Sequence, residues 1–195
     1  MTQDELNQKL IEAVDNKNIT EIKSLLNQGA NVNAQEKYGW TPLHWAALNG
    51  YYDVAKLLIE NGADVNIKNN GGWTPLHEAA FKECYDIVKL LIDNGADVNT
   101  QNEDGTSPLH ISAMKGYHDT AKLLIENGAD VNKQNNYGET PLHRAVRENK
   151  YDIVKLLIDN GADPFITDKD GKTSLDTCQN DDIRSLLEKY MEEYH

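Results

Sequence analysis

The chain has 195 residues, 39% of them hydrophobic, which suits one ordinary folded domain. It carries 32 acidic and 19 basic side chains, for a formal net charge of -13. This surplus of negative charge disfavours nucleic-acid phosphates and anionic membranes, which are bound mainly by Lys and Arg, and it favours a basic partner surface.

Two short sequence markers recur every 33 residues. The first is Thr-Pro-Leu-His, present at 41–44, 74–77 and 140–143, at 107–110 with Ser in place of Thr, and in degraded form at 173–176. The second is a Gly-Ala pair that begins at residues 29, 62, 95, 128 and 161. Two markers that share one period over five copies indicate a repeat protein in which each repeat is one supersecondary element.

Each repeat is predicted to fold as a helix, a turn, a second helix and a loop. Thr41 can cap the first helix, and Pro42 at the first helical position loses no hydrogen bond. Gly50 suits the left-handed conformation that ends that helix. Asp53 lies in the first turn of the second helix, where the helix dipole favours negative charge, and Gly62 follows its end.

The end of the first helix departs from glycine in two repeats. The residues equivalent to Gly50 are Glu83, Gly116 and Asn149. Asparagine tolerates the left-handed conformation, whereas glutamate adopts it at a cost of about 1 kcal/mol. We therefore expect Glu83 to be a strained position.

Both ends of the chain are weaker copies of the repeat. Residues 2–35 are predicted to form a helix pair without Thr-Pro-Leu-His. Residues 168–190 are predicted to form a shortened last unit, because Leu186-Leu187 arrives four residues earlier than the period requires. Atypical terminal units of this kind close the exposed ends of a solenoid.

The segment Gly39-Trp40-Thr41-Pro42-Leu43-His44, followed by Leu57-Leu58-Ile59-Glu60-Asn61-Gly62-Ala63-Asp64, resembles a unit of the ankyrin repeat family. The resemblance implies an all-α, ankyrin-repeat α-solenoid and a single domain over residues 1–195. It has four full repeats at 36–68, 69–101, 102–134 and 135–167, with capping units at 2–35 and 168–190. It also implies that the histidine of each motif is structural and ties its turn to the backbone of an adjacent loop.

The residue pattern gives little support to catalysis or to a metal site. His44, His77, His110 and His143 lie one to a layer, too far apart to converge on one ion. The Asn102–Gly105 segment lacks the alternating ligands of a calcium loop, and no serine or glycine motif suits a nucleophile or a phosphate. We expect no catalytic residue, metal or cofactor. For Cys84 the sequence favours an incidental surface or packing position, with a reactive thiol as the alternative.

The residues that vary between repeats are where a binding function must be encoded. They fall at the loop tip, before Thr-Pro-Leu-His, and on one face of the first helix, surfaces that bind partners in proteins that resemble this one. The candidate partner-binding residues are Tyr38, Trp40, Trp45, Leu48, Trp73, Glu78, Phe81, Ile111, Met114, Tyr137, Arg144 and Arg147.

This set divides by chemistry along the chain. All three tryptophans and Phe81 belong to it, which predicts an apolar, aromatic anchor in the N-terminal half. Arg144 and Arg147 predict a charged rim toward the C-terminus. For Trp45 and Phe81 the alternative is packing against neighbouring first helices.

The sequence thus favours a non-catalytic, protein-binding module such as an adaptor, with its binding surface on the concave side formed by the loop tips and first helices. The partner would be another protein, with no nucleic acid and no membrane, and the chain itself would be monomeric or weakly self-associating. Alternatives are a structural, self-associating scaffold and a secreted, host-directed effector of an intracellular microbe. The acidic N-terminus and the widely separated Cys84 and Cys178 predict a cytoplasmic protein, or one exported to a host cell without a signal peptide.

Overall fold

In the computed structural model, which describes residues 1–193, all regular structure is helical. The chain forms two compact units, Met1–Asp97 and a second from Val98 onward. The single domain expected from the sequence over residues 1–195 stays a prediction.

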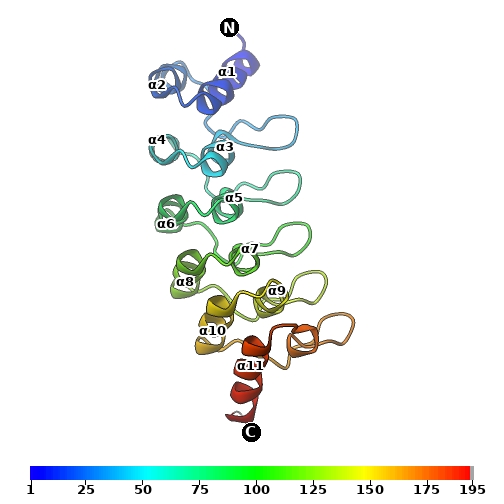
Figure 1. The fold of residues 1–195 in the computed structure, drawn as a ribbon. Helices are drawn as coiled ribbons and strands as arrows, with labels where there is room; N and C mark the ends of the chain where they lie inside the picture. The colour runs from blue at the N-terminus through cyan, green and yellow to red at the C-terminus, as the bar shows by residue number, and fades with distance from the viewer. Residues whose placement is uncertain (194–195) are drawn as a thin grey trace. The chain divides into compact units, whose positions relative to one another are not determined.

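The first unit contains three helix pairs (Figure 1). These are α1 (Gln3–Asp15) with α2 (Ile19–Asn27), α3 (Pro42–Asn49) with α4 (Tyr52–Glu60), and α5 (Pro75–Phe81) with α6 (Tyr85–Asp93). The first helices α1, α3 and α5 pack in sequence on one another, and α4 packs on α6. Leu43, Leu58, Leu76 and Leu91 are fully buried between these layers.

The second unit repeats the arrangement with a shortened last layer. It contains α7 (Pro108–Lys115) with α8 (His118–Glu126), α9 (Pro141–Arg147) with α10 (Tyr151–Asp159), and the 3-10 turn η1 (Leu175–Thr177) with α11 (Asp181–Glu193). The four-residue deficit predicted for residues 168–190 reduces the first helix of that layer to η1. Asp176 replaces the motif histidine there and accepts hydrogen bonds from the amide and hydroxyl of Thr173.

The Thr-Pro-Leu-His motif closes the N-terminus of each first helix in the predicted way. The Thr41 hydroxyl accepts a hydrogen bond from the His44 amide, and the Thr41 amide donates to His44 Nδ1 at 3.1 Å. Since Nδ1 accepts, the proton is on Nε2, which donates to the carbonyl oxygen of Trp73 in the next loop at 2.9 Å. His110 and His143 bond the carbonyls of Glu139 and Lys172 in the same way. The predicted structural role of these histidines is confirmed.

The left-handed ends of the first helices also follow the prediction. Gly50 and Gly116 have φ values of 71° and 84°, and Glu83 and Asn149 adopt the same region at 57° and 56°. Lys17, between α1 and α2, is a further left-handed residue, with φ 52°; it lies one period of 33 before Gly50, an equivalence that the sequence analysis did not use.

A ladder of asparagines joins successive loops within each unit, a feature that sequence reasoning missed. In the first unit Asn33 donates to the Gly62 carbonyl and accepts from the Asp64 amide, and Asn66 does the same with Gly95 and Asp97. Its sequence signal was present, because these asparagines share the 33-residue period. The ladder satisfies loop backbone groups that no helix or sheet pairs.

Candidate partner-binding surface

The first unit holds a groove of about 420 Å³ between the loop tips and the first helices α3 and α5. Its lining includes six of the residues predicted from the sequence: Tyr38, Trp40, Leu48, Trp73, Glu78 and Phe81. Asn69, Asn70 and Gly71 complete it at the tip of the second loop. In Figure 1 these loops extend from the same side of the unit as α3 and α5.

The rings of Trp40, Trp73 and Phe81 in the groove are packed in pairs, one of them with Trp45, which does not line the groove. Trp40 lies against Trp45, with ring centroids 4.8 Å apart, and Trp73 meets Phe81 nearly edge-on at 6.0 Å. Both geometries are favourable for aromatic pairs. All four rings are half-buried, whereas Tyr38 at the loop tip is 61% exposed. The groove is therefore a fixed apolar wall with one exposed aromatic at its edge.

A backbone hydrogen bond joins the two loop tips, and the side chain of Asn69 orders the second loop. The Asn70 amide donates to the Tyr38 carbonyl at 3.0 Å, and Asn69 Oδ1 accepts from the amides of Gly71 and Trp73. Gly39 allows this approach, because a Cβ there would lie 2.6 Å from Asn70 Oδ1, and its φ of 76° is left-handed. The rings of the groove are thus held in place before any partner arrives.

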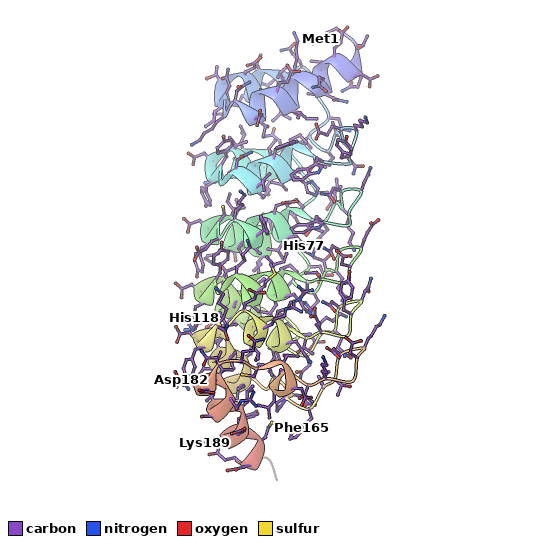
Figure 2. The ribbon with its side chains drawn as sticks, turned by 45° about the vertical axis from the view of Figure 1, so that its right-hand side comes forward. Met1, His77, His118, Phe165, Asp182 and Lys189 are labelled. Carbon is purple, nitrogen blue, oxygen red and sulfur yellow. The ribbon has the colours of Figure 1, made fainter. Side chains whose placement is uncertain are left out.

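His44 holds the backbone of Trp73 in place through the hydrogen bond that its Nε2 donates to the Trp73 carbonyl. Burial lowers the pKa of His44 to about 4, although the hydrogen bond to Trp73 opposes the shift. The ring is therefore neutral at pH 7 and keeps Nδ1 free to accept from Thr41. His77 lies at the start of α5 on the loop side of the helices, as Figure 2 shows.

Glu78 is the exceptional residue of the groove. It is only 4% exposed, and burial raises its pKa to about 7, an effect that the positive charge of Lys82 partly offsets. Within residues 1–193 no hydrogen bond or ion pair reaches its carboxylate, whose oxygens keep a small contact with solvent. An acidic group so placed is costly unless something compensates it.

Two predicted binding residues are buried. Glu78, 4% exposed, lines the groove, whereas Ile111, 2% exposed, lines neither groove, and its part in binding stays a prediction. Trp45, Glu78 and Arg144 occupy the position of Ile111 in the other repeats. At this position the side chain starts from the buried part of the first helix. Long side chains such as those of Trp45 and Arg144 reach partial exposure from there, and isoleucine does not. Met114, one turn later, is half-buried.

The second unit holds a groove of about 500 Å³ at the equivalent place. Tyr137, Glu139 and Arg147 stand 99 residues after Tyr38, Trp40 and Leu48, which is three periods of 33. Lys172 likewise takes the place of Trp73. The same architecture therefore carries aromatic residues in one unit and charged residues in the other.

The charges of this second groove are paired with one another. Glu139 Oε2 lies 2.7 Å from Arg144 Nε, and Glu139 Oε1 pairs with Arg147. Burial alone would raise the pKa of Glu139, but the amide of Asn135 and the two arginines hold it below its ordinary value. Unlike Glu78, the buried carboxylate of Glu139 is paired with Asn135, Arg144 and Arg147.

The described residues contain no group of three or more His, Cys, Asp or Glu that could hold a metal ion. In the Asn102–Gly105 loop tip, Asn102 Oδ1 accepts hydrogen bonds from the amides of Asp104 and Thr106. This side chain therefore stabilises the turn. The two cysteines are unpaired. Within residues 1–193, every helix is too short or too polar to cross a bilayer.

Two known proteins resemble a short part of the chain, and a family model matches most of its length. Protein phosphatase 1 regulatory subunit 27 of Homo sapiens and its Mus musculus counterpart are each 43% identical to it over 47 residues. That match covers 24% of this chain and 30% of those proteins. A family model of ankyrin repeats in three copies matches residues 10–102 and 94–168, well over half of the chain. With its stacked helix pairs, histidine-capped turns and matching family model, the chain belongs to the ankyrin repeat family.

Proposed function

We propose that the chain is a non-catalytic module that binds a partner protein through the groove of its first unit. Ankyrin repeats in general mediate protein–protein interaction. The partial relative is named as a regulatory subunit of a phosphatase, and a regulatory role exerted by binding is compatible with that likeness. Regulation of an enzyme by docking would need no catalytic group on this chain.

The observation that carries the proposal is the preorganised aromatic wall of Trp40, Trp73 and Phe81. Tryptophan and tyrosine are the residues most enriched in binding hot spots, and half-buried rings lose little conformational entropy on binding. Loop tips held by the bond between Asn70 and Tyr38 reduce the ordering cost further. The charged groove of the second unit, with Arg147 and Tyr137, offers a separate polar surface.

The test compares two tyrosines of the first unit. Tyr38→Ala removes the exposed aromatic of the groove, and Tyr85→Ala removes a tyrosine on α6, outside it, that is 40% exposed. Proteins captured from the native cell by each variant are quantified against wild type, after melting curves show that both variants fold.

We expect Tyr38→Ala to lose the partner and Tyr85→Ala to retain it. Equal retention by both variants would contradict the proposal. Sedimentation of the purified protein tests the rival self-associating role, since a dimer that Tyr38→Ala dissociates would identify a second copy as the occupant.

A further inference from the structure

The groove of the first unit combines an apolar wall with one buried carboxylate, that of Glu78, which has no hydrogen-bond or ion-pair partner within residues 1–193. Glu78 and Phe81 are three residues apart on α5 and therefore share a face of the helix. Trp73 contacts Phe81 edge-on, so the carboxylate-bearing side chain and two aromatic rings line one end of the groove.

This combination suits a cation. An ammonium group over an aromatic face is attracted by the ring quadrupole, and groups of aromatic rings recognise methylated lysine and other alkylammonium ions. The chain's own lysines already behave in this way at the groove. Lys37 Nζ lies 5.6 Å from the Tyr38 ring centroid, and Lys82 Nζ lies 6.0 Å from that of Phe81.

We propose that this groove takes a lysine side chain of the partner protein, with its ammonium group against Glu78 and the rings of Trp73 and Phe81. The proposal rests on the proposed function and names the chemistry of the partner. The groove volume of about 420 Å³ lies within the range of sites that enclose small ligand groups. The net charge of -13 would also steer a basic segment toward the chain.

Glu78 then has a role that folding alone does not explain. Burial of an unpaired carboxylate opposes folding, and its pKa of about 7 leaves it partly protonated in the free protein. A bound ammonium would compensate the charge and favour the ionised form. Within residues 1–193, the positive charge that lowers the pKa of Glu78 is that of Lys82, an exposed residue four positions later.

The second unit provides an internal comparison. Its equivalent groove is also lined by Asp168 and Asp170, but it carries the cationic side chains Arg144, Arg147, Lys169 and Lys172, and its buried carboxylate, Glu139, is already paired. A cation should therefore bind the first groove and not the second, although both are built on the same repeat.

The experiment titrates the whole chain with three small probes at pH 8, where Glu78 is ionised. The probes are N-acetyl-lysine methylamide, its Nε-trimethylated form and the neutral N-acetyl-norleucine methylamide. Binding is followed by NMR through the indole N–H signals of Trp40 and Trp73, with Tyr137 ring signals reporting on the second groove. We expect both cationic probes to shift the indole signals saturably, and the neutral probe to bind at least several-fold more weakly.

Two variants make the result specific. Glu78→Gln, which keeps the shape of the side chain, should weaken both cationic probes roughly tenfold, the loss expected for a charge-assisted contact. Glu139→Gln, the matched change in the second groove, should leave their binding unchanged. The ratio of trimethylated to unmodified affinity then tells which form of lysine the rings prefer.

The outcomes separate this inference from the proposed function. Equal binding of the neutral probe, or undiminished binding to Glu78→Gln, would overturn the lysine assignment and leave an apolar docking groove. Indole signals that no cationic probe moves would also overturn it. The capture experiment with Tyr38→Ala stands or fails independently of these results.

Discussion

Glu78→Gln should stabilise the first unit in a pH-dependent way. The pKa of this carboxyl is about 7 in the folded protein against 4.5 for its ordinary value. Between those two pKa values the folded state binds more protons than the unfolded state. The contribution of the Glu78 carboxyl to the free energy of unfolding is therefore complete below pH 4.5 and is lost as the pH rises through 7. At about 1.4 kcal/mol for each unit of pKa, the full loss is about 3 kcal/mol.

Glutamine mimics the protonated carboxyl at every pH. We therefore expect wild type and Glu78→Gln to unfold alike at pH 4.5, and the variant to be more stable by about 3 kcal/mol at pH 8. His44, whose buried ring has a pKa of about 4, costs stability as the pH falls below 6.5, with the opposite sign. Since His44 is present in both proteins, it cancels in the difference.

The assay is urea unfolding at several pH values, followed by tryptophan fluorescence. All three tryptophans lie in the first unit, so the signal reports on that unit whatever the second does. Glu60→Gln, at an exposed residue of α4 that pairs weakly with Lys56, is the control and should change stability by less than about 0.5 kcal/mol. A difference between wild type and Glu78→Gln that stays constant from pH 5 to 8 would refute the reasoning.

Two further predictions concern the backbone. Glu83→Gly should raise the free energy of unfolding by about 1 kcal/mol by relieving a left-handed φ of 57°, and Asn149→Gly should raise it less. Thermal melts check both variants. A melting temperature of Glu83→Gly equal to or below that of wild type would contradict this. Gly39→Ala should lower the free energy of unfolding in urea by about 2–3 kcal/mol, because its Cβ would lie 2.6 Å from Asn70 Oδ1. Gly62→Ala, with open space around the Cβ, should lower it by only about 1 kcal/mol. Similar losses from both alanines would mean that the loop tips are not tightly fitted.

Much of the fold could be predicted because the local signals agree with one another. Thr41, Pro42 and Gly50 each specify the start or end of a helix by short-range chemistry, and the period of 33 repeats that information. The left-handed conformation of Glu83 followed from its equivalence to Gly50. The same equivalence applies to Lys17, which lies one period before Gly50, and the Gly-Ala marker at residue 29 sets the register there although residues 2–35 lack Thr-Pro-Leu-His.

The candidate site was less predictable, because burial at a varying position depends on the length of the side chain. Trp45 and Ile111 occupy the same place in the repeat, yet only the tryptophan reaches partial exposure. Sequence variation indicated where the groove lies. It did not show that Glu78 is buried without a partner, or that Glu139 is neutralised by two arginines from its own repeat.

The most direct test of the account is a photo-crosslink from the groove itself. A benzoylphenylalanine placed at Tyr38, in the groove, is compared with one placed at Tyr85, outside it, in the native cell. The account predicts a discrete crosslinked partner protein, joined through a lysine-containing segment, from position 38 and none from position 85. Crosslinking from position 85 alone, or from neither position, would contradict it.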